Sequence, residues 1–193
     1  MAVDAAAAME LTNIEFVFLD RDGVLNRKPP PGQFVTRWED FELLPGVEDA
    51  IATLNRSGRK AIVVTNQRGV ALGLYSLEEL AEMHERLQKL LSARGSCLDG
   101  IYVCPHDVGQ CSCRKPQTGL FEQAFRDFPD ACAANSVMIG DSLRDIEAGR
   151  NLEMRTVLVD DGGEDLEGAR SLADLCVSSL PEFVQRLSAP HRF

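Results

Sequence analysis

Four aspartates stand in two short groups whose spacing suits phosphoryl chemistry. Asp20 and Asp22 flank one arginine, and Asp141 and Asp145 lie four residues apart further along the chain. Clustered carboxylates repel one another unless one is protonated or a cation lies between them. A hard cation such as Mg²⁺ prefers oxygen ligands of this kind, and a carboxylate can also attack a phosphoryl group.

Two further side chains could bind the oxygens of a phosphoryl group. Thr65 supplies a hydroxyl in the stretch Val-Thr-Asn-Gln, residues 64–67, and Lys115 supplies an ammonium in Arg-Lys-Pro, residues 114–116. Positive charge placed where negative charge develops stabilises a transition state strongly. An aspartate that follows a strand is usually only a turn or cap residue, so it is the coincidence of these groups that indicates a site.

A third group of residues has the composition of a zinc site. Its four members fall within ten residues, spaced C-x-H-x4-C-x-C: Cys104, His106, Cys111 and Cys113. Three thiolates and one imidazole make a closed structural zinc set, because four protein ligands leave no open position for a substrate. The sequence therefore predicts a structural Zn²⁺ that holds the loop presenting Arg114 and Lys115. A redox-active disulfide or a chance grouping stays open as an alternative.

These groups need a scaffold, and the apolar pattern supplies one. Short β-branched runs predict five buried parallel strands, at residues 14–19, 60–65, 100–104, 136–140 and 155–159, with a sixth at 174–178. Helical patterns occupy residues 46–57, 76–94, 119–128, 145–151 and 181–187. Alternating strands and helices predict an α/β fold with a doubly wound parallel sheet. Ligands of such sheets bind beyond the carboxyl ends of the strands, where the candidate residues fall.

Length and charge restrict the class of protein. A chain of 193 residues fits one domain, expected over residues 13–190, with a flexible tail at 1–12. The net charge of −10 argues against a nucleic-acid or anionic-membrane partner. The first residues lack the basic-then-apolar order of a signal peptide, and no run of 18 apolar residues occurs. We expect a cytoplasmic protein, in keeping with cysteines grouped in one loop.

The motifs around the aspartates resemble those of haloacid dehalogenase superfamily phosphatases. The similar stretches are residues 18–25, 64–67, 114–116 and 139–142 with Asp145, in the order of that family and across about residues 14–160. The resemblance implies a Rossmann-like sheet. Only about 40 residues separate Asp22 from Thr65, and about 50 separate Thr65 from Lys115. These intervals leave no room for a large cap domain, so we expect a capless enzyme rimmed by residues 26–45 and by the cysteine loop.

The resemblance also implies a role for each residue. Asp20 would attack phosphorus and become an aspartyl phosphate, and Asp22 would protonate the leaving oxygen and then activate water. Thr65 and Lys115 would bind the phosphoryl oxygens. Mg²⁺ would be held by the carboxylates of Asp20 and Asp141 and by the backbone carbonyl of Asp22. Asp145 would support this site from behind.

The cysteine loop before Arg-Lys-Pro narrows the resemblance to two related families. It looks like that of the D-glycero-D-manno-heptose 1,7-bisphosphate phosphatases, which implies removal of the 7-phosphate. A histidinol-phosphate phosphatase is the alternative. In the first case Asn66, Arg114 and residues 37–40 would touch the sugar or its second phosphate, and the partner would be a small phosphorylated sugar bound by a monomer.

A different class of function is a zinc-bearing interaction module on an inactive phosphatase fold. The intact set of acids, Thr65 and Lys115 argues against it. Other candidates have structural interpretations. His84 lies in a helical stripe and is expected to be packed or exposed rather than catalytic, and Trp38 is either a platform for a sugar or an anchor for its loop. Three cysteines outside the cluster are expected to be small core residues: Cys97, Cys132 and Cys176.

Overall fold

Six parallel strands form one sheet in the order β3-β2-β1-β4-β5-β6. The computed structural model describes residues 13–160, 162 and 166–188. The strands are β1 Phe16–Leu19, β2 Lys60–Asn66, β3 Gly100–Cys104, β4 Ser136–Gly140, β5 Arg155–Val159 and β6 Leu175–Val177. All six predicted strands are therefore confirmed, with β1 beginning two residues later than expected.

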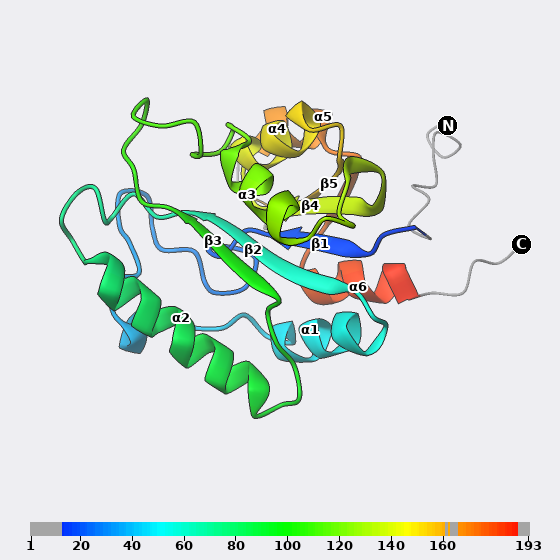
Figure 1. The fold of residues 1–193 in the computed structure, drawn as a ribbon, viewed down its shortest axis with the longest axis horizontal. Helices are drawn as coiled ribbons and strands as arrows, with labels where there is room; N and C mark the ends of the chain where they lie inside the picture. Colours follow the sequence, from blue (N-terminus) through cyan, green and yellow to red (C-terminus); the bar gives the residue numbers. More distant parts are fainter. Residues whose placement is uncertain (1–12, 161, 163–165, 189–193) are drawn as a thin grey trace, which may run out of the picture.

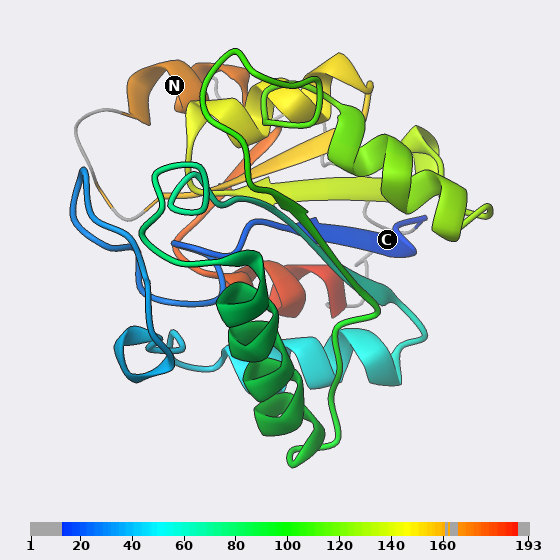
Figure 2. The same ribbon diagram turned by 60° about the vertical axis from the view of Figure 1, so that its left-hand side comes forward.

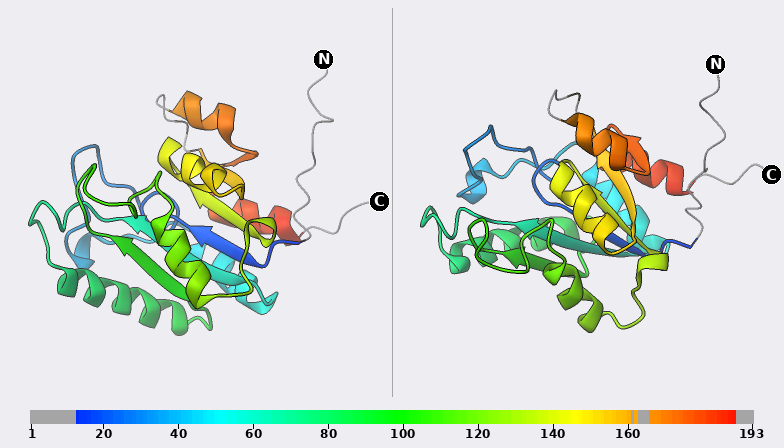
Figure 3. Two further views of the ribbon diagram at one scale, coloured as in Figure 1. Left: turned by 45° about the horizontal axis from the view of Figure 1, so that its top comes forward. Right: turned by 90° about the horizontal axis from the view of Figure 1, so that it is seen from above.

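The helices cover both faces of the sheet, as the predicted doubly wound fold requires (Figure 1). One face carries α1 Val47–Arg56, α2 Leu77–Ser92 and α6 Leu180–Ser188, and the other carries α3 Gly119–Asp127, α4 Leu143–Asn151 and α5 Glu167–Leu172. Figure 3 shows the same arrangement from two further directions. Among these helices, α5 is the one that the sequence pattern did not predict.

Alternation along β1 divides the core between the two layers. Val17 and Leu19 pack in the cluster that includes α1, α2 and α6, whereas Phe16 and Phe18 pack in the cluster beneath α3. All four are buried, which explains the continuous apolar run that predicted a strand covered on both faces.

The chain changes direction across the sheet between β1 and β4. In an open α/β sheet, ligands bind beside such a reversal of strand order, at the carboxyl ends of the strands. The loops after β1, β2 and β3 gather at this end, at the left in Figure 1 and again in Figure 2. The fold therefore brings the residues that follow β1, β2 and β4 to one place.

Within residues 13–160 no inserted domain covers this end of the sheet, as expected for a capless fold. The segment between β1 and α1 contains one short 3₁₀ helix, Trp38–Asp40. The Trp38 ring stacks on Phe41 at 5.3 Å and packs against the core. Trp38 is thus an anchor for its loop.

The prediction for the three cysteines outside the cluster is wrong. Cys97, Cys132 and Cys176 are all exposed. Cys97 lies in the connection from α2 to β3 and Cys132 precedes a 3₁₀ helix, while Cys176 lies on the edge strand β6. The predicted tail at 1–12 and the predicted boundary at 190 lie outside the described residues. No helix in the described part of the chain is long and apolar enough to cross a membrane.

Candidate active site

The chain curls tightly after β1 and turns its acids toward β4. The carbonyl of Arg21 accepts hydrogen bonds from the backbone N–H groups of Leu25 and Asn26, at 2.8 and 3.2 Å. Gly23 has a φ of +90°, and a Cβ built there would lie 2.0 Å from Asp141 Oδ2. Only glycine allows this approach, which brings the turn against Asp141.

Lys115 lies between two of the acids. Its Nζ is 2.9 Å from Asp20 Oδ1 and 2.6 Å from Asp145 Oδ1, and it donates to the Val64 carbonyl at 2.7 Å. The side chain is 1% exposed. Burial alone would lower the pKa of Lys115, but the charges of Asp145 and Asp20 raise it above its usual range. The ammonium is therefore charged and fixed beside Asp20.

Asp145 links this ion pair to the start of α4. Its Oδ2 accepts from the backbone N–H of Ser142 at 3.1 Å and from the Ser142 hydroxyl at 2.5 Å, which completes a capping box. A Cβ at Gly140 would lie 2.1 Å from the Asp145 Cβ, so glycine is needed here too. Asp145 thus connects Lys115 to the first turn of α4.

Asp20, Asp141 and Asp145 form a crowded anionic group. They offer carboxylate oxygens that all lie within 4.8 Å of one another. Burial raises the pKa of Asp20 to about 7, with repulsion from Asp145 and Asp141 adding to it and Lys115 opposing. Burial and the charge of Asp145 raise the pKa of Asp141 to about 6, although Lys28 Nζ lies 2.7 Å from its Oδ2.

These observations test whether the residues suit a metal ion. Among the described residues, no group donates a hydrogen bond in good geometry to the buried Asp20 Oδ1. Two carboxylates whose ionisation is disfavoured by burial and by their neighbours are stabilised by a hard divalent cation. Asp20 and Asp141 therefore fit such an ion, whereas Asp145 is already engaged by Lys115 and Ser142.

The carboxylate of Asp22 makes a separate set of contacts. Arg21 Nη2 donates to both of its oxygens at 3.0 Å, Asn26 Nδ2 donates at 2.8 Å and Gln67 Nε2 donates at 3.1 Å. Gln67 is itself held by the Tyr75 hydroxyl, which donates to its Oε1 at 2.7 Å. Sequence reasoning named Asp22 alone. The available signal was that Arg21 and Gln67 belong to the same motif stretches.

The three residues that were expected to bind the substrate have different surroundings in the structure. Thr65 is buried, and its hydroxyl accepts from Gln67 Nε2 at 2.9 Å. The amide of Asn66 is hydrogen-bonded to the backbone of Lys115. Arg114 lies on the wall of the cleft and donates to the His106 carbonyl at 3.4 Å.

A cleft of about 290 Å³ is lined by Asp20, Asp22, Asp141 and Lys115, and also by Asn66 and Arg114, whereas Thr65 lies behind its wall. Its walls include residues 28–35, from the loop after β1, but not residues 37–40, where Arg37 is paired with Asp40. In a chain of net charge −10, four cationic side chains besides Lys115 nevertheless line the cleft: Lys28, Arg68, Arg114 and Arg144. Such a cleft suits an anionic ligand.

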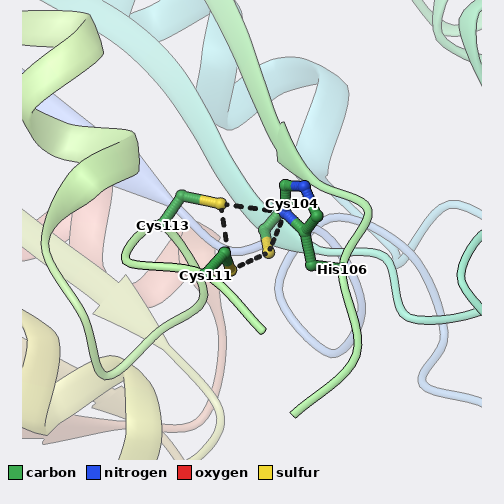
Figure 4. Close-up of side chains that lie close together, drawn as sticks. All are labelled: Cys104, His106, Cys111 and Cys113. Atoms are coloured by element: carbon green, nitrogen blue, oxygen red, sulfur yellow. Dashed lines mark hydrogen bonds between the residues drawn. The ribbon is translucent and has the colours of Figure 1, made fainter. Parts of the chain in front are cut away.

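The cysteine loop brings its four candidate ligands together (Figure 4). Cys111 Sγ lies 3.5 Å from Cys104 Sγ and 3.3 Å from Cys113 Sγ, and His106 Nδ1 lies 3.3 Å from Cys113 Sγ and 3.7 Å from Cys104 Sγ. Zinc bonded to sulfur at about 2.3 Å separates the corners of its tetrahedron by about 3.8 Å. The four atoms therefore have the spacing of a zinc site.

The ionisation of these thiols also suits a metal. Burial raises the pKa of Cys104 and of Cys113. Burial opposes ionisation of Cys111 as well, but hydrogen bonds from Cys113 lower its pKa to about 7. A cation among the sulfurs would favour all three thiolates. The loop is joined to the cleft by the ion pair of Arg68 with Asp107, whose atoms lie 2.5 Å apart.

Comparisons with known proteins identify the class to which this chain belongs. A family model described as HAD-hydrolase-like matches residues 112–183. A D,D-heptose 1,7-bisphosphate phosphatase from B. bronchiseptica, solved with magnesium and phosphate, matches with a TM-score of 0.81 and 30% identity over 90% of this chain and 98% of that one. The fold and the site thus define a HAD-like hydrolase, and the resemblance read from the motifs is confirmed.

Curated relatives narrow the class. The chain is 40% identical to the D-glycero-alpha-D-manno-heptose-1,7-bisphosphate 7-phosphatase of Mycobacterium bovis, over 86% of this chain and 88% of that protein. It is 38% identical to the corresponding beta enzyme of Haemophilus ducreyi, over 87% and 95%. The chain belongs to the D-glycero-D-manno-heptose-1,7-bisphosphate 7-phosphatase family, and it is a phosphatase.

Proposed function

We propose that this enzyme removes the 7-phosphate of D-glycero-D-manno-heptose 1,7-bisphosphate in a reaction that requires Mg²⁺. The observation that carries the proposal is the position of Asp20, a buried carboxylate held beside the Lys115 ammonium in a cleft with four further cations. The names of the relatives support the heptose substrate over histidinol phosphate. A substrate with two phosphates also suits a cleft with this much positive charge.

The chain's own residues would carry the reaction in two steps. Asp20 attacks phosphorus and forms an aspartyl phosphate, while Asp22 gives its proton to the departing sugar oxygen. Asp22 then takes a proton from water, and the resulting hydroxide hydrolyses the aspartyl phosphate to phosphate and free Asp20. Lys115 offsets the negative charge of the phosphoryl oxygens throughout. Asp145 keeps Lys115 charged and in place.

The Mg²⁺ would be held by the carboxylates of Asp20 and Asp141 and by the backbone carbonyl of Asp22. When bound there, it supplies positive charge that makes attack by one anion on another possible. The raised pKa values of Asp20 and Asp141 support this assignment, because a divalent cation would stabilise two carboxylates whose ionisation is disfavoured even beside Lys115 and Lys28. Lys28 Nζ lies 2.7 Å from Asp141 Oδ2 and so borders the proposed metal site.

Three residues are proposed to bind or arrange the substrate. The Thr65 hydroxyl accepts from Gln67, so its own hydrogen remains to donate to a phosphoryl oxygen. Arg114, on the wall of the cleft, would bind the sugar or its second phosphate. Asn66 is better placed to act through the Lys115 backbone, which occupies its amide.

A structural Zn²⁺ is proposed at Cys104, His106, Cys111 and Cys113. The spacing of the four ligand atoms supports it. Because Arg114 and Lys115 follow the last ligand directly, the ion would fix the segment that presents them. Cysteines that serve as metal ligands rather than as disulfides fit the cytoplasm, and we propose that the enzyme acts as a monomer.

A substrate screen tests the proposal. Both anomers of the heptose bisphosphate, histidinol phosphate and 4-nitrophenyl phosphate are assayed with Mg²⁺ and with EDTA. We expect the highest kcat/KM with one heptose anomer, a product that keeps its C1 phosphate in ³¹P NMR, and no turnover in EDTA. A higher kcat/KM with histidinol phosphate would identify histidinol phosphate as the substrate instead. If no phosphate were turned over, the protein would be an interaction module rather than a phosphatase.

A further inference from the structure

Arg21, between the two acids of the first motif, is entirely buried. It is 1% exposed and ranks among the largest buried side chains of the described residues. A buried guanidinium is costly unless it is paired. Arg21 is paired with Asp22. Its Nε donates to Asp22 Oδ1 at 3.2 Å, and its Nη2 donates to both carboxylate oxygens at 3.0 Å. The ring of Phe41 lies against it, 5.6 Å from the guanidinium carbon.

The remaining end of this guanidinium contacts helix α2. Arg21 Nη1 lies 3.3 Å from His84 Nε2, and at 3.8 Å from the sulfur of Met83. Arginine has donors but no acceptor. His84 must therefore accept through Nε2, so its proton is on Nδ1 and its ring is neutral.

The neutral form of His84 has a clear physical origin. His84 is 7% exposed. Burial, followed by the positive charge of Arg21, lowers the pKa of His84 to about 4. The ring is therefore neutral, and an acceptor, at neutral pH. It offers the guanidinium a directed hydrogen bond that an apolar residue of α2 would not.

The contacts define a chain from α2 to the acid of the reaction. Asp22 receives hydrogen bonds from Asn26 and Gln67 as well as from Arg21, but within the described part of the chain only the Arg21 guanidinium contacts both carboxylate oxygens. Rotation of the guanidinium would therefore rotate the carboxylate. At Nη1 the shorter contact that opposes such a rotation is the one to His84, at 3.3 Å, beside the 3.8 Å contact with the Met83 sulfur.

We propose that His84 is a positioning residue, which orients the Asp22 carboxylate for proton transfer by fixing the Arg21 guanidinium. The inference rests on the proposed role of Asp22 as acid and base. His84 lies 63 positions from Arg21 along the chain, on helix α2, which supplies no residue to the wall of the cleft. His84 acts on the reaction without touching the substrate.

The test exploits the chemistry of the leaving group. The 7-oxygen of the sugar must be protonated as it leaves, whereas 4-nitrophenolate departs as a stable anion without a general acid. kcat/KM reports the steps up to this departure. Loss of Asp22 orientation should therefore lower kcat/KM for the sugar phosphate and spare it for 4-nitrophenyl phosphate. A general loss of structure would lower both.

Three variants of α2 are compared with Asp22→Asn. His84→Leu removes the acceptor, and we expect kcat/KM for the heptose bisphosphate to fall about tenfold or more, with that for 4-nitrophenyl phosphate within about twofold. His84→Gln presents an oxygen near the position of Nε2 and should restore most of the sugar-phosphate activity. Leu87→Met, a volume-conserving change at a buried residue about one turn further along α2, should leave kcat/KM for both substrates unchanged. Arg21→Lys keeps the positive charge but loses the guanidinium contact with both Asp22 oxygens. It should therefore show the same selective loss of kcat/KM for the sugar phosphate, and it tests the inference even if the His84→Leu protein folds poorly.

Each other outcome overturns a specific statement. Suppose that Asp22→Asn lowers kcat/KM for the sugar phosphate selectively. The inference is then overturned if His84→Leu lowers kcat/KM equally for both substrates, or for neither. If Asp22→Asn itself failed to discriminate, Asp22 would not be the general acid, and the inference would fall with the proposed function.

Discussion

The side-chain amide of Asn66 and the backbone of Lys115 exchange two hydrogen bonds. Asn66 Nδ2 donates to the Lys115 carbonyl at 3.1 Å, and the Lys115 N–H donates to Asn66 Oδ1 at 3.0 Å. These residues are 49 positions apart. The end of β2 thereby fixes the point at which the chain leaves the cysteine loop and presents its lysine to Asp20.

Asn66→Ala tests the value of this contact. Both hydrogen bonds disappear, so we expect kcat to fall about tenfold to a hundredfold through misplacement of Lys115, with an unchanged zinc content. Asn55→Ala is a matched control, because Asn55 Oδ1 holds the Cys97 backbone in the same way, at 2.9 Å and away from the cleft. Wild-type kinetics for the Asn66 variant would show that the two hydrogen bonds between Asn66 and Lys115 do not affect catalysis.

Asp20→Asn should abolish turnover without unfolding the protein. The change removes the proposed nucleophile and a metal ligand together, and we expect less than about a thousandth of the wild-type kcat, a barrier increase of roughly 4 kcal/mol. Asp160→Asn is the control: Asp160 follows β5 as Asp20 follows β1, but pairs with Arg170. A residual rate above that level would assign the nucleophile to another residue.

Asp22→Asn should trap the covalent intermediate. Without its base, the enzyme forms the aspartyl phosphate faster than water removes it when the leaving group is 4-nitrophenolate. Mass spectrometry of an acid-quenched reaction should find an adduct of roughly 80 Da, the mass of one phosphoryl group on the nucleophilic carboxylate. The adduct should be missing from Asp20→Asn, and its absence from both variants would count against covalent catalysis.

Zinc should remain with the protein through dialysis, at about one ion per chain, and Cys111→Ser should lower both zinc content and kcat. Lys115→Ala should lower kcat as far or further while retaining zinc.

The double variant of Cys111→Ser and Lys115→Ala tests how the ion acts. If the ion positions the segment of Arg114 and Lys115, the fall in kcat of the double variant should be much smaller than the product of the two single effects. Multiplicative losses would point to a separate role for the loop. Cys132→Ser, at an exposed thiol outside the cluster, should change neither zinc content nor kcat.

His84 should make the protein sensitive to acid. Its pKa is about 4 in the folded state, against 6.5 for an unperturbed histidine. Between these values the unfolded chain binds more protons than the folded one, so stability falls as the pH falls from 6.5 to 4, by on the order of 3 kcal/mol. Urea unfolding of wild type and His84→Gln across this range should give curves that diverge toward low pH. Parallel curves would mean that His84 titrates normally in the fold.

The strands, the acids and the cysteine cluster follow from local features of the sequence. A continuous β-branched run is buried on both faces wherever it lies in a parallel sheet, so the strands were predicted within about two residues. Asp20 and Asp141 each follow such a run directly, and parallel strands all end at the same edge. Four soft ligands within ten residues need no distant partner to meet.

Hydrogen-bond partners from distant segments depended on the tertiary structure. Nothing local to Arg21 shows that its side chain turns inward to grip Asp22, or that His84 from α2 completes its contacts. The same holds for Asn66, expected at the sugar and found on the Lys115 backbone. Cys176 was misassigned because the strand order places β6 at the edge of the sheet, and Cys97 and Cys132 because they lie in connections outside the core. Local spacing determined which groups reach the cleft. Their orientations were decided only by the packing of α2 and of the loops after β1 and β3, because a directed hydrogen bond requires both partners to be placed in space.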